Sequence, residues 1–165
     1  MRVYVPLTLS RLAEAYKAGE LGPAPLTAYA VTPALREWYV SDDIEELEYA
    51  ALNRAALASL RLIAGDSGVA RRRVVVAVDV PDAGLEPELG PDAALGEVRV
   101  AGVLGFKKVA AVHVDAEDAE GDVAAAVGVL GAADQGDDDA RFTVDGVEDH
   151  ELLWFATQEI PGLIG

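Results

Sequence analysis

The chain has 165 residues, of which 52% are hydrophobic and 25% are charged, a balance that indicates a globular protein and excludes a disordered one. It has no cysteine, which excludes disulfide bonds, zinc–thiolate sites, iron–sulfur clusters and thiol nucleophiles. A formal net charge of −16 argues against nucleic acid and anionic membrane surfaces as partners.

The negative charge is concentrated in the last third of the chain. Residues 1–114 carry 12 basic and 15 acidic side chains, whereas residues 115–165 carry 1 basic side chain, Arg141, and 14 acidic ones. Such a distribution is typical of a solvated surface that keeps a protein soluble. A basic partner and divalent cations are the alternatives.

The length predicts a single domain over residues 1–165 with its own hydrophobic core. Residues 1–21 lack the apolar stretch and small-residue cleavage site of a signal peptide. No apolar run approaches the roughly 18 residues of a membrane span. We therefore expect a cytoplasmic protein.

The first 40 residues predict two strands and two helices. β-branched and aromatic residues cluster at 2–8 and 26–32, which favours strands there. Between them, residues 11–21 place their apolar side chains on one face of a helix. Thr32, followed by proline, predicts the N-cap of a short helix over 33–40.

The middle of the chain predicts a long buried helix and a central strand. Asp42 is the expected N-cap of a helix that ends near Gly65. Residues 71–81 form a nearly continuous valine run, typical of a strand covered on both faces, and the arginines at 71–73 are expected to be its exposed lead-in. The helix has an apolar stripe, namely Ile44, Leu47, Ala51, Ala55, Ala58 and Leu62.

A long surface loop is expected over 82–97, where glycine, proline and acidic residues are frequent. Strands are predicted at 98–104 and 108–116, and an alanine-rich helix at 119–133.

The C-terminal segment predicts an acidic loop at 134–140, a short strand at 141–146 and a last helix over 147–160. Together the elements indicate an α/β or α+β protein. We expect a single-domain layered sandwich, a mixed sheet of about five strands with helices packed on it.

Three side chains are candidates for a catalytic or ligand-binding site. His113 and Asp115 project from the same face of a predicted strand, an arrangement that suits a base with its orienting acid or a pair of metal ligands. Glu48 falls within the apolar arc of the long helix, so it must be paired or have a raised pKa. Tyr4 is a further member of such a site. The alternative is that all four are structural.

His150 lies among acidic residues, flanked by Glu148, Asp149 and Glu151. It is the remaining catalytic candidate. The alternative is that these acids occupy the first turn of a helix, where the helix dipole alone explains them. The acidic stretches do not fit the calcium-binding loop pattern, and no glycine pattern indicates a phosphate site. We therefore expect no bound metal and no cofactor.

Four consecutive large apolar residues, 152–155, cannot all be buried on one face of a helix. Leu153 and Trp154 are therefore candidates for an interface with another element or another chain. The sheet-facing side of the predicted last helix is expected to consist of Leu152, Phe155 and Ala156.

Five segments are similar to an actinobacterial family of small proteins that is described only as a domain of unknown function. They are "MRVYVPLT", "TPALREWY", "EELEYAALNRAA", "VAAVHVDAED" and "EDHELLWFATQEI", which together span nearly the whole chain. The resemblance implies a single domain and brings no activity or catalytic residue with it.

Two functions stay open at this point. The first is an interaction or regulatory module that forms a homo-oligomer or docks on a protein partner through the apolar residues near the C-terminus. The second is a small enzyme or ligand-binding protein with a site around His113, Asp115 and Glu48.

Overall fold

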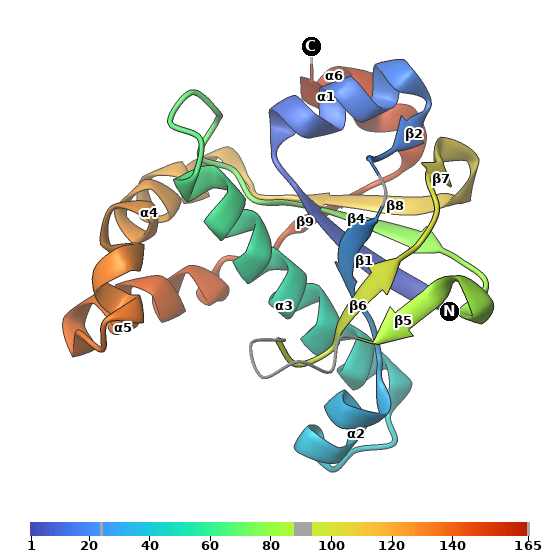
Figure 1. Cartoon of the computed structure of the whole chain (residues 1–165). Helices are drawn as coiled ribbons and strands as arrows, with labels where there is room; N and C mark the ends of the chain where they lie inside the picture. The colour runs from blue at the N-terminus through green and yellow to red at the C-terminus, as the bar shows by residue number, and fades with distance from the viewer. Residues whose placement is uncertain (24, 88–93, 165) are drawn as a thin grey trace.

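The computed structural model describes residues 1–23, 25–87 and 94–164, and its centre is a seven-stranded sheet (Figure 1). The strand order is β5-β6-β3-β1-β4-β8-β9, and every neighbouring pair is antiparallel. The strands are β1 (Arg2–Leu7), β3 (Leu26–Tyr29), β4 (Val74–Asp79), β5 (Leu85–Pro87), β6 (Glu97–Val100), β8 (Val109–Val114) and β9 (Leu153–Phe155). A separate pair joins β2 (Glu20–Leu21) to β7 (Leu104–Gly105).

The α/β class is therefore confirmed, with two differences in the sheet. It has seven strands rather than about five, and its pairs are antiparallel rather than mixed. The valine-rich strand β4 is central, between β1 and β8, as its apolar run predicts.

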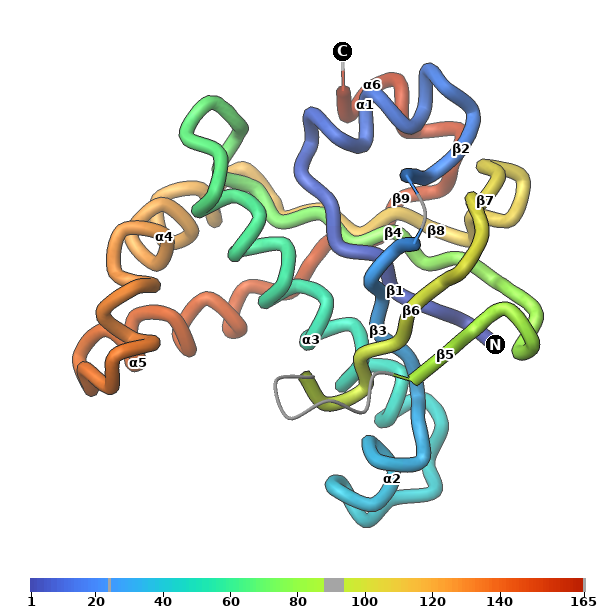
Figure 2. The backbone as a smooth tube through the Cα atoms, viewed as in Figure 1, coloured from blue at the N-terminus to red at the C-terminus, as the bar shows by residue number. Residues whose placement is uncertain are grey.

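Helices cover both faces of the sheet (Figures 1 and 2). Helices α1 (Leu9–Ala18) and α6 (Ile160–Ile164) lie on one face, and α3 (Ile44–Ala64), preceded by α2 (Pro33–Tyr39), lies on the other. Because side chains alternate along a strand, each strand contributes to two cores. The first contains Val3, Val5, Val76, Val112, Leu12 and Ile160. The second contains Tyr4, Val75, Ala77, Ala111, Leu47, Ala51 and Ala55.

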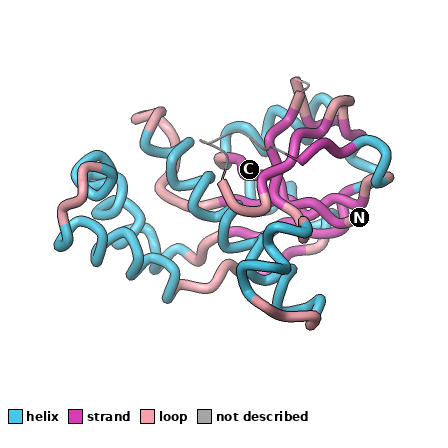
Figure 3. The backbone as a smooth tube through the Cα atoms, turned by 60° about the horizontal axis from the view of Figure 1, so that its bottom comes forward, coloured by secondary structure: helices cyan, strands magenta, loops and turns pink. Residues whose placement is uncertain are grey.

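A helical pair, α4 (Glu120–Asp134) and α5 (Asp138–Gly146), packs on the far half of α3 and extends away from the sheet (Figures 1 and 3). Leu60 and Ile63 of α3 meet Val123 and Leu130 of α4 in a third apolar core. The molecule therefore has a sheet-based part and a helical part that share α3.

Local capping explains where the helices begin. Thr32 accepts a hydrogen bond from the Leu35 backbone at the start of α2, as predicted. Helix α3 is capped by Asp43, one residue beyond the predicted Asp42. The predicted stripe of α3 is buried at Leu47, Ala51 and Ala55, whereas Ile44 is exposed.

Two predicted elements near the C-terminus are wrong. Residues 141–146 belong to α5 rather than to a strand, because Asp137 caps that helix and the next two aspartates occupy its first turn. Residues 147–160 form a 3-10 turn, β9 and a second 3-10 turn rather than one helix. Pairing with β8 gives residues 153–155 their hydrogen bonds, so tertiary context decides this segment.

Short 3-10 turns occupy the remaining connections. They are η1 (Asp82–Gly84), η2 (Phe106–Lys108), η3 (Glu117–Ala119), η4 (Val147–Asp149) and η5 (Thr157–Glu159).

Candidate functional site

A buried ion pair joins the ends of two central strands. Arg73 precedes β4 and Asp115 follows β8, and the register Val74 to Val114 brings them face to face. The carboxylate Oδ2 of Asp115 accepts from the backbone N and the Nε of Arg73, both at 2.8 Å, and Oδ1 accepts from Nη2 at 2.7 Å. The side chains are 5% and 0% exposed, so this pair is shielded from water.

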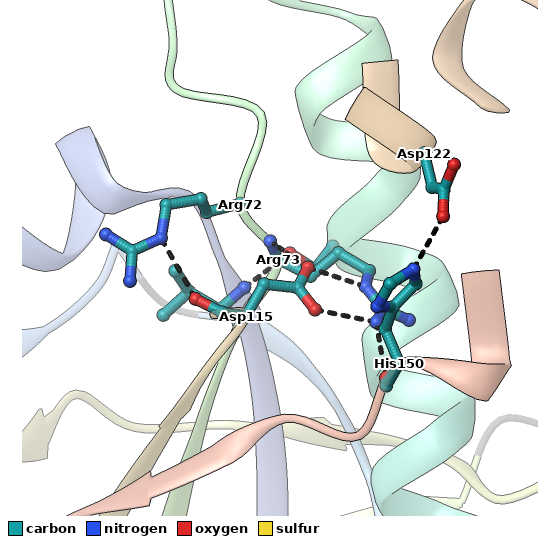
Figure 4. A network of polar contacts seen from close by, with 7 residues as sticks. Arg72, Arg73, Asp115, Asp122 and His150 are labelled. Atoms are coloured by element: carbon teal, nitrogen blue, oxygen red, sulfur yellow. Dashed lines mark hydrogen bonds and ion pairs between the residues drawn. The ribbon is translucent and has the colours of Figure 1, made fainter. Parts of the chain in front are cut away.

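The pair is the centre of a larger network (Figure 4). Nη2 of Arg73 also donates to the backbone oxygen of His150 at 2.9 Å, and Nε of Arg72 donates to the backbone oxygen of Asp115 at 2.9 Å. The His150 ring Nε2 lies 2.6 Å from Oδ2 of Asp122 in the first turn of α4. The network thus ties the segment leading into β9 to β4, β8 and α4.

Beside this network, a cavity of about 310 Å³ lies between α3, α4, α5 and η4. Arg73 lines it from the sheet side, and Arg61, Asp134 and Arg141 line it from the helices. Asp145 and Glu148 add two carboxylates. Its apolar walls include Ala56, Leu57, Leu60, Leu130, Val144 and Val147.

Glu48 is half-buried and is bonded to a tyrosine. The Tyr4 hydroxyl on β1 donates to Oε2 of Glu48 at 3.3 Å. Burial, followed by the nearby Glu48 charge, raises the pKa of Tyr4, so the phenol stays protonated and remains a donor. Glu48 is therefore paired with a tyrosine, which is one of the alternatives that its place in the apolar arc leaves open.

His113 lies on the α3 side of β8, between Val75 of β4 and Trp154 of β9 in the register. Its side chain is half-buried. Burial, and secondarily the positive charge of Arg2, lowers its pKa below the usual value. His113 therefore favours the neutral form in the folded protein.

This preference makes stability depend on pH. In the unfolded chain the pKa of a histidine is about 6.5. Below that pH the unfolded chain binds more protons than the folded one. The contribution of His113 to the free energy of unfolding is therefore full above about pH 6.5, and it is lost as the pH falls toward the lowered pKa of the folded state. We expect the free energy of unfolding to drop less between about pH 7 and about pH 5.5 in His113→Gln than in the unmodified protein. Urea denaturation at both pH values measures this, and equal drops would contradict it.

Strand β9 places two apolar side chains at the edge of the sheet. Trp154 is 61% exposed and Leu153 is 46% exposed, whereas Phe155 packs against the first core. The predicted covered face of Leu152, Phe155 and Ala156 is wrong in its helical form, because alternate strand residues point to opposite sides.

The predicted candidate residues form hydrogen bonds with different partners. Asp115 is bonded to Arg73, Glu48 to Tyr4 and His150 to Asp122. Within the described residues, no hydrogen bond links His113 to any of them, and a joint catalytic role for these residues stays a prediction.

Arg73 is buried, contrary to the predicted exposed lead-in to β4. It is only 4% exposed. The signal that could have identified it is its position directly before a fully buried strand, with an acid directly after a neighbouring one. A charge at such a position must be paired.

Two negative observations apply to residues 1–23, 25–87 and 94–164. There, no group of three or more histidine or acidic side chains is arranged to hold a metal ion. Nor does any helix in these ranges combine the length and apolar character needed to cross a membrane.

The fold and its features define an antiparallel α/β sandwich with an exposed edge strand and an arginine-lined cavity under a helical pair. The chain belongs to the Family of unknown function (DUF6912), whose model matches residues 1–164. No curated protein and no solved structure gives a significant match.

Proposed function

We propose that the protein is an interaction module that self-associates through strand β9. The observation that carries this proposal is Trp154, a large aromatic side chain that is 61% exposed on an edge strand. Edge strands present unpaired backbone groups that another strand can bind.

The two edges of the sheet are not equivalent. Strand β5 ends with Pro87, which has no backbone N–H to donate, and proline is a common way of blocking an edge. Residues 153–155 of β9 contain no proline, so each backbone N–H of this strand that points away from β8 remains available as a donor. Of the two edges, β9 is therefore the better template for strand pairing.

A symmetric pairing of two β9 strands suits these side chains. Antiparallel pairing centred on Trp154 places the two indole rings beside each other on one side of the joined sheet. It also sets Leu153 of each copy opposite Phe155 of the other. The two-fold interface would cover the most exposed apolar side chain of β9.

Charge opposes this association and supplies a diagnostic signature. Each copy carries a net charge of −16, so two copies repel each other at low ionic strength. Salt screens that repulsion. We expect dimerisation to strengthen when the salt concentration rises from about 0.02 M to about 0.5 M.

Sedimentation equilibrium of the purified chain tests the proposal. We expect a reversible dimer with a dissociation constant in about the micromolar range or weaker, because small interfaces are transient. Replacing Trp154 by lysine should raise the constant at least about tenfold through loss of a central aromatic contact.

The matched control is Trp38→Lys, because Trp38 is 69% exposed on α2, outside the sheet, and its replacement changes the charge equally. It should leave the dissociation constant within about twofold. A monomer at every salt and protein concentration, or equal effects of the two variants, would contradict self-association.

A protein partner that adds its own strand to β9 is the second candidate. The charge distribution favours it, because residues 115–165 hold 14 acidic side chains and 1 basic one, a surface suited to a basic partner. This binding would weaken with salt, opposite to the dimer.

We further propose that the protein is soluble and acts in the cytoplasm of an actinobacterium. The acidic composition supports solubility, and the absence of cysteine fits the cytoplasm. The resemblance of the quoted segments and the abundance of alanine, glycine and valine support an actinobacterial source.

A further inference from the structure

One wall of the cavity beneath the helical pair is formed by the largely buried guanidinium of Arg73. Arg73 directs Nε and Nη2 to Asp115 and the His150 backbone. Its Nη1 has no hydrogen-bond partner among the described residues, although Arg73 is more than nine-tenths buried and lines the cavity. A guanidinium does not lose its proton in proteins, so Nη1 offers donors to a molecule inside the cavity.

A second guanidinium lies at the α5 side. Nε of Arg141 donates to the backbone oxygen of Ala133 at 3.3 Å, and its two Nη groups have no hydrogen-bond partner within the described part of the chain. Arg141 is the one basic residue in 115–165, and it lines this cavity. Arg73 and Arg141 together favour a ligand with a hydrogen-bond-accepting anionic group.

The acidic neighbours limit how much negative charge the ligand can carry. Asp134 is bonded to Arg61 through two contacts of 2.9 Å, so these charges offset each other. Asp145 and Glu148 also line the cavity, and in the described structure neither forms an ion pair. A polyphosphate would meet both carboxylates. The charge of Arg73 is already offset by Asp115, so only a ligand with a single negative charge suits hydrogen bonds from Arg73 and the charge of Arg141.

The walls and the size specify the rest of the ligand. Leucine, valine and alanine side chains line the cavity, so an apolar body is favoured over a sugar or a fully polar molecule. The volume of about 310 Å³ lies at the lower end of the ~300–1,000 Å³ range of small-molecule sites.

We propose that this cavity binds a small monocarboxylate with an apolar body. Its carboxylate would accept hydrogen bonds from Arg73 and Arg141, and its apolar part would contact Leu60, Leu130 and Val144 of the walls. The site involves neither β9 nor Trp154, so the proposal is independent of self-association.

A titration of the full chain with three probes tests the ligand class. Phenylacetate carries one carboxylate on an apolar ring, phenylacetamide is its uncharged counterpart, and inorganic phosphate is an anion without an apolar body. With backbone amide NMR shifts as the readout, we expect phenylacetate to bind with a dissociation constant of about 1 mM, as is usual for so small a ligand. The shifts should centre on Ala56, Ala133 and Val144, and phenylacetamide and phosphate should bind at least about tenfold more weakly.

Variants locate the binding without disturbing the buried pair. Arg141→Gln should weaken phenylacetate at least about tenfold through loss of a charged donor. The control Arg36→Gln removes the same charge from an exposed position on α2 and should change binding less than about twofold. Val144→Trp, which fills the cavity without changing charge, should abolish binding.

Several outcomes would overturn the proposal. They are the absence of phenylacetate binding, equal binding of phenylacetamide, tighter binding of phosphate, and equal effects of Arg141→Gln and Arg36→Gln. Circular dichroism of each variant separates loss of binding from loss of folding. If Val144→Trp does not fold, the decision rests on the Arg141→Gln comparison.

Discussion

Replacing Asp115 by alanine is expected to lower the free energy of unfolding by about 3–5 kcal/mol. The substitution removes a carboxylate that accepts three hydrogen bonds from Arg73, and it leaves a guanidinium that is 5% exposed without its counter-charge. An unpaired buried charge is far more costly than the pair is stabilising. Urea denaturation monitored by circular dichroism measures the difference.

The double variant Arg73→Met/Asp115→Leu is the informative control. It removes both charges and keeps apolar volume, so it should recover most of the stability lost in Asp115→Ala. Asp138→Ala, at an exposed acid in the first turn of α5, should lose less than about 1 kcal/mol. If Asp115→Ala lost no more than Asp138→Ala, the pair could not be the buried centre of this network.

Replacing Ser59 by alanine is expected to cost about 2–4 kcal/mol, because two buried backbone groups lose their partner. Ser59 of α3 is fully buried, and its hydroxyl donates to the Leu7 backbone oxygen at 2.7 Å. The hydroxyl oxygen Oγ of Ser59 in turn accepts a hydrogen bond from the Val74 backbone N at 2.9 Å. This one side chain therefore joins α3 to the ends of β1 and β4.

Ser67→Ala is the matched control, because Ser67 is exposed in the turn after α3. It should change the free energy of unfolding by no more than about 0.5 kcal/mol. Equal losses in the two variants would show that the bonds of Ser59 contribute nothing measurable to stability.

The elements that could be predicted are those whose signals are local. The long apolar period of α3, the Thr32 cap and the valine run of β4 depend on neighbours within a few residues, and each is present in the structure. Sheet order depends on pairings across long stretches of chain, which no local pattern specifies.

The C-terminal errors have a specific physical origin. The acids at 137–139 suit a loop and a helix start equally well by composition, and the cap formed by Asp137 decides for the helix. Residues 153–155 suit either a helix or a strand, and the open edge of β8 decides for the strand. In both cases the missing information was the position of a partner.

The candidate site also has features with local sequence signals and features that depend on distant partners. Leu153 and Trp154 are exposed, but on strand β9 rather than on the predicted helix, so the helix-face reasoning behind their selection does not apply to them. The role of Arg73 could not be predicted, because its partner Asp115 is 42 residues away and only the β4–β8 register brings the two together.

Hydrogen exchange of the β9 backbone amides at increasing protein concentration tests self-association most directly. Pairing of two β9 strands would bury amides at the sheet edge, and exchange there follows the monomer fraction. We predict that exchange slows at those amides of residues 153–155 that point away from β8 as the concentration rises through the dissociation constant, while exchange in α2 stays unchanged. Exchange in β9 that is independent of concentration, in a sample that sedimentation shows to be dimeric, would place the interface elsewhere and contradict the proposal.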